Sequence, residues 1–217
     1  MRFILDLTAL ILHVGTLSLL FFYDVSPWLI AMESTTILFH IYYVLPIGQG
    51  TWGVPRVEKW YEYGISATLG TIAVLDTSKW ELIVLFALIG NAQQLQGIIL
   101  ERNWNYESFI SGALIQLAEF IYVGSTRLDT TYFVYVAFYS IFGVLAYIRI
   151  QKADVSEELY SLFGFVAKLA LFYSELFDTW WIYVIVWVLL MLASVGIYFR
   201  KQEQALTPIP QRVRVDI

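Results

Sequence analysis

The stretch LYSLFGFVAKLALFYSELF, residues 159–177, holds a lysine, Lys168, in the middle of an apolar run that is long enough to cross a membrane as a helix. An ammonium group at the centre of a membrane helix costs at least about 2.5–3.5 kcal/mol, so an intramembrane lysine indicates a functional site. An amine in a dry apolar pocket can also lose its proton and condense with an aldehyde to form a Schiff base. The chemistry of the chain therefore depends on what lies around Lys168.

The composition is that of a membrane protein. Of the 217 residues, 59% are hydrophobic, 18% are aromatic and only 14% are charged, whereas a soluble domain carries about 25% charged residues. The chain has no cysteine, so disulfides and thiolate chemistry are excluded. The sequence shows no nucleic-acid motif and no cleavable signal peptide. We expect an all-α, polytopic membrane helical bundle.

Eight apolar stretches have the length of about 20 residues that a membrane span needs. Proline, glycine and an Asp-Thr-Ser turn separate them. Ser156 is expected to cap the seventh helix ahead of two glutamates. Residues 201–217 contain prolines and alternating basic residues, and we expect a cytoplasmic tail without a fold. The predicted spans are 3–23, 27–46, 55–75, 80–100, 106–124, 130–149, 157–177 and 180–199.

The positive-inside rule gives the orientation of these spans. With the N-terminus inside, ten basic residues fall on the inner side, and only Lys79 and Arg127 fall on the outer side. Lys168 is the remaining basic residue, inside the membrane. This asymmetry predicts that both termini are cytoplasmic, which requires an even number of spans.

A buried lysine needs an anion nearby or it loses its proton. Glu62 is the best candidate, because it lies about 10 Å along the third span and Lys168 about 18 Å along the seventh, which runs in the same direction. The lysine stem and a helix tilt can close that gap. His13 and His40 lie mid-span in adjacent helices, and we interpret them as part of the same polar cavity, where they can buffer a proton. The alternative is that each is a hydrogen-bonded core residue; no third ligand supports a metal site.

Three more glutamates, Glu33, Glu119 and Glu175, are expected toward the outer side. They are either part of a proton path or interfacial carboxylates that reach the lipid headgroups. Aromatic residues at helical spacing in the sixth span, including Phe138 and Phe142, either line a pocket for a flat polyene or pack in the core.

A lysine in the seventh span and a carboxylate in the third resemble the Schiff-base and counterion pattern of microbial rhodopsins. Four segments resemble the heliorhodopsins in particular, over roughly residues 5–177. The N-terminus-inside orientation agrees with that family. The segments are KWYEYGISATL (59–69), GNAQQLQGIILE (90–101), YFVYVAFYSIF (132–142) and LYSLFGFVAKLAL (159–171).

The resemblance implies a seven-helix retinal-binding bundle at residues 1–178, with all-trans retinal bound covalently to Lys168 as a protonated Schiff base and Glu62 as its counterion. His13 and His40 would belong to a proton-accepting cavity. The eighth transmembrane helix, at 179–200, lies outside the family pattern. Further residues expected around the chromophore are Tyr63, Ser66, Asn91, Gly97, Phe138, Phe142 and Tyr173. Gly64, Gly164 and Tyr173 depart from the residues that are common in the family.

These features favour a light-absorbing photoreceptor rather than an enzyme. One alternative is a light-gated proton or cation channel that uses Glu33, Glu119 and Glu175. A second alternative is a transporter or assembly subunit without retinal, in which Lys168 forms a structural ion pair. The expected partners are membrane lipids, a second copy of the chain in a homo-oligomer, with a dimer favoured, and a cytoplasmic signalling protein.

Overall fold

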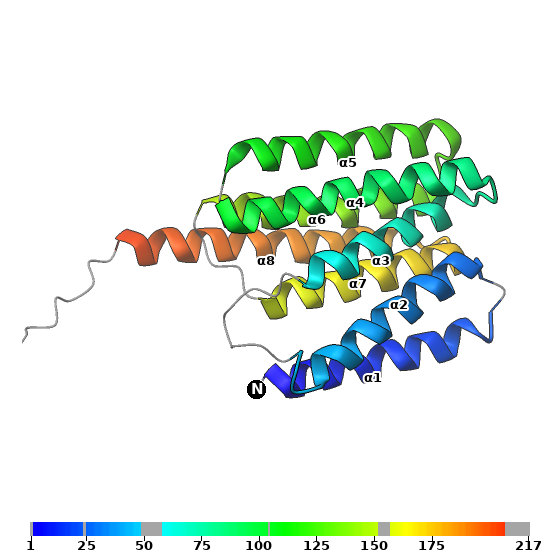
Figure 1. Ribbon diagram of the computed structural model, residues 1–217, viewed down its shortest axis with the longest axis horizontal. Helices are drawn as coiled ribbons and strands as arrows, with labels where there is room; N and C mark the ends of the chain where they lie inside the picture. The colour runs from blue at the N-terminus through cyan, green and yellow to red at the C-terminus, as the bar shows by residue number, and fades with distance from the viewer. Residues whose placement is uncertain (1, 24, 49–57, 104, 152–156, 207–217) are drawn as a thin grey trace, which may run out of the picture.

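The computed structural model describes residues 2–23, 25–48, 58–103, 105–151 and 157–206, and these form eight α-helices (Figure 1). The prediction of an all-α bundle is confirmed. The helices are α1 (Arg2–Leu20), α2 (Pro27–Val44), α3 (Glu58–Leu75), α4 (Trp80–Asn103), α5 (Tyr106–Thr126), α6 (Thr130–Ile150), α7 (Glu157–Leu176) and α8 (Trp180–Leu206).

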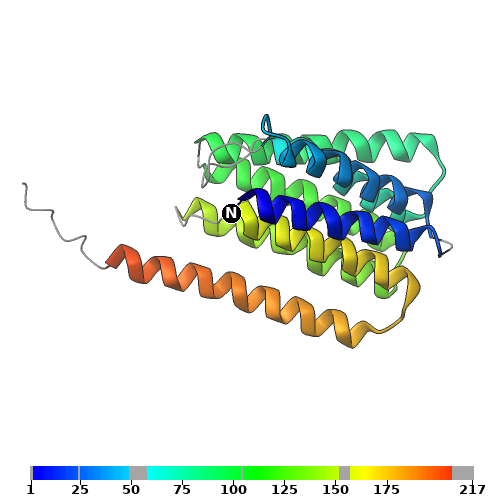
Figure 2. The same cartoon turned by 90° about the horizontal axis from the view of Figure 1, so that it is seen from below.

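Consecutive helices from α1 to α7 pack against one another, and α7 also contacts α1. The interior helix is α3, which packs against α2, α4, α5 and α6 and buries residues along most of its length. The outermost helix α8 packs mainly on α6. Figure 2 shows that the C-terminal end of α8 extends past the ends of the other helices.

Short polar side chains begin several of these helices. Ser26 accepts a hydrogen bond from the backbone of Trp28 at the start of α2, where Pro27 is the first helical residue. Asn105 caps α5 through Ser108 N at 2.9 Å, and Asp129 caps α6. The proposed cap of α7, Ser156, lies outside the described residues.

The helix boundaries differ from the predicted spans mainly at three ends, one of which is that of α4, which continues to Asn103 rather than ending at 100. The first helix ends at Leu20 rather than at residue 23, and α8 continues to Leu206 rather than ending at 199. Residues 201–206, expected to be part of an unfolded tail, are therefore helical; polar residues with good helix propensity continue the apolar helix. Residues 207–217 lie outside the described part of the chain.

Three helices of the described chain are long and apolar enough to cross a membrane: α4 over Trp80–Leu100, α5 over Tyr106–Thr126 and α6 over Thr130–Ile150. The apolar stretches of α1 and α8 are shorter, and α2, α3 and α7 carry polar residues in their middle. A row of large apolar side chains is exposed along α5, as expected for a surface that meets lipid or another protein. This row contains Ile110, Leu114, Leu117 and Ile121.

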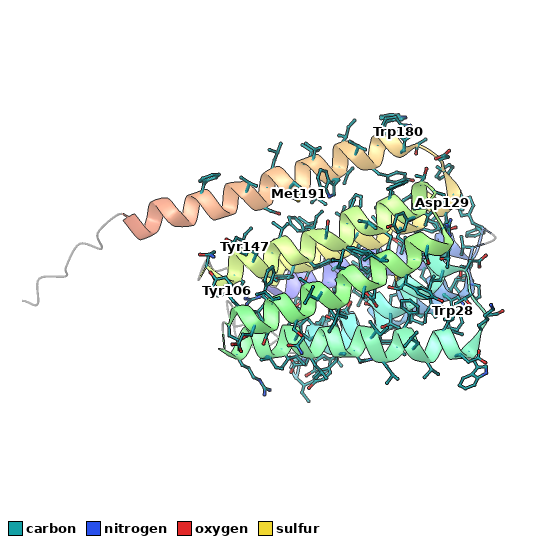
Figure 3. The ribbon with its side chains drawn as sticks, turned by 90° about the horizontal axis from the view of Figure 1, so that it is seen from above. Trp28, Tyr106, Asp129, Tyr147, Trp180 and Met191 are labelled. Carbon is teal, nitrogen blue, oxygen red and sulfur yellow. The ribbon has the colours of Figure 1, made fainter. Side chains whose placement is uncertain are left out.

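Two apolar clusters form the core. One joins α6, α7 and α8 and includes Phe138, Leu145 and Phe163, with Tyr183, Trp187 and Met191 of α8 against it. Figure 3 shows Met191 on the side of α8 that faces the bundle. The other cluster joins α2, α3, α5, α6 and α7 and is built from Leu29, Met32, Ala73, Val74, Val123, Tyr135 and Leu171.

The second cluster makes a testable prediction about stability. Leu171→Ala removes a side chain that is 1% exposed at the meeting point of these helices. We expect a cost of about 2–5 kcal/mol and a thermal midpoint lower by roughly 5 °C or more in detergent. Leu192→Ala is the matched control, because Leu192 of α8 is 62% exposed. Equal shifts for the two variants would contradict the core assignment.

Candidate functional site

The Lys168 ammonium lies between three helices. Its Nζ atom donates to Glu62 Oε1 on α3 at 2.9 Å and to Thr36 Oγ1 on α2 at 2.5 Å. All three residues are buried. The structure thus brings together Lys168 and Glu62, and it adds Thr36 as a third member. A buried charge is tolerated only when it is paired and hydrogen-bonded in this way.

The second oxygen of Glu62 also has a partner. Tyr43 on α2 donates its hydroxyl to Glu62 Oε2 at 3.4 Å. Lys168 Nζ lies 6.0 Å from the centre of the Tyr63 ring, the next residue along α3. The carboxylate is therefore held from α2 and α7 at once, which fixes its position next to the lysine nitrogen.

The two histidines belong to the same buried region. His13 Nδ1 on α1 lies 2.7 Å from Glu33 Oε1 on α2, and both side chains are almost fully buried. The His13 and His40 rings are 4.8 Å apart, and the His40 ring is 5.6 Å from that of Tyr43. A line of titratable groups thus runs from Glu33 through the histidines and Tyr43 to the carboxylate beside Lys168.

The three glutamates expected toward the outer side, Glu33, Glu119 and Glu175, lie in different parts of the structure and have different partners. Glu33 and Glu119 are buried, so for these two the interfacial alternative was wrong. Glu119 accepts from Gln116 Nε2 at 3.0 Å within α5. Glu175, on α7, pairs with Arg127 at 3.0 Å. Of the three, the structure brings only Glu33 into the network around Lys168.

Arg127 connects several elements at the end of the bundle opposite to the chain's N-terminus. It donates to Val74 O on α3 at 3.1 Å and to Asp129, the cap of α6, at 2.5 Å, in addition to its pair with Glu175. Burial lowers the pKa of Arg127, but its hydrogen bonds and charge pairing with Asp129 and Glu175 outweigh that effect, and the pKa is raised. The guanidinium is therefore a permanent charge that ties α3, α6 and α7 together.

A cavity of about 370 Å³ lies on the other side of Lys168, between α3, α4, α5, α6 and α7. Its volume falls in the range of about 300–1,000 Å³ that small-molecule sites have. It reaches the surface between α5 and α6, where Ala113 and Gly143 line it and are exposed. Residues expected around the chromophore that do line the cavity are Lys168, Tyr63, Ser66, Gly97 and Phe142.

Two features inside the cavity indicate a fitted ligand site. The Ser66 hydroxyl is buried and has no hydrogen-bond partner within the described part of the chain. Gly97 on α4 lies directly beneath the Trp60 indole, so that a Cβ at this position would overlap the ring. The glycine lets an aromatic side chain lie flat along the cavity, which suits a flat, elongated, apolar ligand.

Three residues expected near the chromophore lie elsewhere. The Asn91 side chain is exposed and donates to Ala87 O at 2.7 Å. Phe138 is buried in the cluster between α6, α7 and α8. Tyr173 is 38% exposed and its ring lies against Phe177. For Tyr173 the reason is rotation around α7, because a side chain five residues after Lys168 points about 140° away from it.

Several cavity and network residues were not singled out from the sequence. Thr36 and Tyr43 carried a detectable signal, because with Glu33 and His40 they recur on α2 at helical spacing and so form one polar stripe. Trp60 and Tyr139 had no such signal, since aromatic residues are frequent throughout this chain. They are also cavity-lining residues.

The chain was compared with protein-family models, with curated proteins and with solved structures. No family model, no curated protein and no solved structure matches it.

Proposed function

We propose that this chain is a multi-pass membrane photoreceptor that binds all-trans retinal on Lys168, with Glu62 as the counterion, as its resemblance to the heliorhodopsins implies. One observation carries the proposal. Lys168 lines an apolar cavity of ligand size and is at the same time paired with a buried carboxylate. An amine that only stabilised the fold would not need an adjacent cavity.

The distribution of charges and aromatic residues supports the membrane assignment. Figure 3 shows Trp28, Asp129 and Trp180 at one end of the bundle and Tyr106 and Tyr147 at the other. Aromatic residues at both ends are typical of the two membrane interfaces, and the basic residues favour the end with Tyr147 as the cytoplasmic side. We propose eight spans with both termini on that side.

The residues of the chain have distinct roles in this proposal. When bound, retinal would supply light absorption and isomerisation. Lys168 supplies the amine, Glu62 stabilises positive charge on its nitrogen, and Thr36 accepts a hydrogen bond from that nitrogen. The aromatic walls exclude water and hold a polyene in one plane.

The line of groups toward α1 offers a place for a proton. Starting from the carboxylate of Glu62, each side chain contacts the next one in the order Tyr43, His40, His13 and Glu33. An imidazole can accept a proton on one ring nitrogen and donate from the other, and the Glu33 carboxylate lies 2.7 Å from His13 Nδ1. We therefore assign this cluster as the acceptor of a proton released near Lys168.

The attachment site can be tested directly. Purified protein mixed with all-trans retinal is expected to develop a visible absorption band, and the Lys168→Ala variant is expected to lack that band. The control is Lys79→Ala, which is expected to keep the band because Lys79 is exposed in the connection between α3 and α4. Borohydride reduction followed by peptide mass spectrometry is expected to find the adduct on Lys168. A parent protein without colour would favour the alternative of a transporter or assembly subunit with a structural ion pair.

The counterion assignment makes a separate prediction. Glu62→Gln removes the negative charge 2.9 Å from the lysine nitrogen, so the band is expected at longer wavelength. The pKa of the Schiff base is expected to fall, because an adjacent anion favours its charged form. In a pH titration the visible band would then be lost at lower pH than in the parent. Glu175→Gln is the control, since Glu175 pairs with Arg127 instead; an unchanged Glu62→Gln spectrum would refute the assignment.

The two alternatives differ in the photocurrent that they predict: a channel gives a light-dependent current, and a photoreceptor without transport gives none. Because Glu119 and Glu175 have local partners away from Lys168, we expect no photocurrent. Voltage-clamp recording of cells that express the pigment, at several voltages and pH values, checks this. A light-dependent current that Glu33→Gln reduces would establish a conducting path instead.

A further inference from the structure

The cavity beside Lys168 has two chemically different ends. Near α7 it is lined by Gly164, Ala167 and the lysine, with Tyr63 and Phe142 alongside. Across from α7, the wall formed by α4 and α5 carries a group of amides. Figure 1 shows α5 on the far side of the bundle from α7, with α4 and α6 between them. The amides are Gln93, Gln94, Gln96 and Gln116.

Two of these amides are already engaged with each other. Gln93 Nε2 donates to Gln116 Oε1 at 2.5 Å, and Gln116 Nε2 donates to Glu119 Oε2 at 3.0 Å. This chain of bonds crosses from α4 to α5 and fixes the wall of the cavity. Glu119 is itself buried, so polar groups continue behind the amides that line the α4–α5 wall of the cavity.

The other two amides have unused hydrogen-bonding capacity. Gln94 and Gln96 line the cavity and are partly buried, and no hydrogen-bond partner for either is present among the described residues. Their polar atoms are not among the buried unpartnered ones, so they are open to the cavity, where an oxygen atom on a ligand would give either amide a hydrogen-bond partner. A hydrocarbon ring alone would leave both amides unpaired.

Resting on the proposed function, we infer that the natural chromophore is a retinal whose ring carries a hydroxyl group. The aldehyde end is fixed at Lys168, so the ring end of an elongated ligand lies toward the α4–α5 wall. Gln94, on the α3 side of α4, or Gln96, on its α5 side, is then the specificity residue that hydrogen-bonds the ring oxygen. The middle of the cavity, with Trp60 over Gly97, is apolar and aromatic, as a polyene requires.

A competition experiment tests the inference. The apoprotein is incubated with an equimolar mixture of all-trans retinal and all-trans 3-hydroxyretinal, and in parallel with 4-hydroxyretinal as the competitor. The bound aldehydes are released with hydroxylamine and separated by chromatography. The parent protein is expected to be enriched about tenfold in one of the hydroxylated forms, the size of effect that one or two good hydrogen bonds give.

Variants locate the effect. The double substitution Gln94→Leu and Gln96→Leu is expected to bring the ratio to about one, while Leu95→Ala, on the exposed side of the same helix, keeps the parent's ratio. A parent protein that takes up retinal and both hydroxylated forms equally, or that prefers retinal, overturns the inference and leaves the proposed function standing. Absence of pigment with every aldehyde overturns both.

Discussion

The buried pair of Lys168 and Glu62 is the interaction on which the arrangement of the other helices depends. An ammonium group inside an apolar bundle must be matched by an anion and by hydrogen-bond acceptors. These come from α2 and α3, through Thr36 and Glu62, with Tyr43 on the second carboxylate oxygen. The requirement holds α2, α3 and α7 in one register at mid-height, and it places α3 in the interior of the bundle.

The pair also divides the bundle into two regions of different chemistry. Toward α1 and α2 lie groups that can hold or pass a proton, ending at the short contact between His13 and Glu33. Toward α4, α5 and α6 lies a cavity with aromatic and amide walls. A single side chain, Lys168, faces both regions. Under the proposed function, a change in a ligand bound in the cavity would therefore alter the electrostatics around Glu62 and the histidines through the Lys168 nitrogen.

Much of this arrangement could be predicted from the sequence, and the limits have physical causes. Hydropathy identified all eight helices in order, and counting depth along the third and seventh helices, which run in the same direction, paired Lys168 with Glu62. Asn91 and Tyr173 were expected near the chromophore from the resemblance, but both are exposed and lie outside the cavity, because the position of a residue along its helix does not say which way its side chain points. The polar stripe on α2 was readable at helical spacing. The end of α8 could not be predicted from hydropathy, because polar residues with good helix propensity continue a helix without any apolar signal.

The length of α8 has a mechanical consequence. Its 27 residues extend about 40 Å at 1.5 Å per residue, whereas the hydrocarbon core of a bilayer is about 30 Å thick. In Figure 2 its C-terminal part projects past the ends of the other helices. In the proposed eight-span arrangement, the last two turns or so of α8, up to Leu206, would extend beyond the hydrocarbon core as a rigid helix. In that arrangement, a partner that contacted these last turns would meet α8 away from the rest of the bundle.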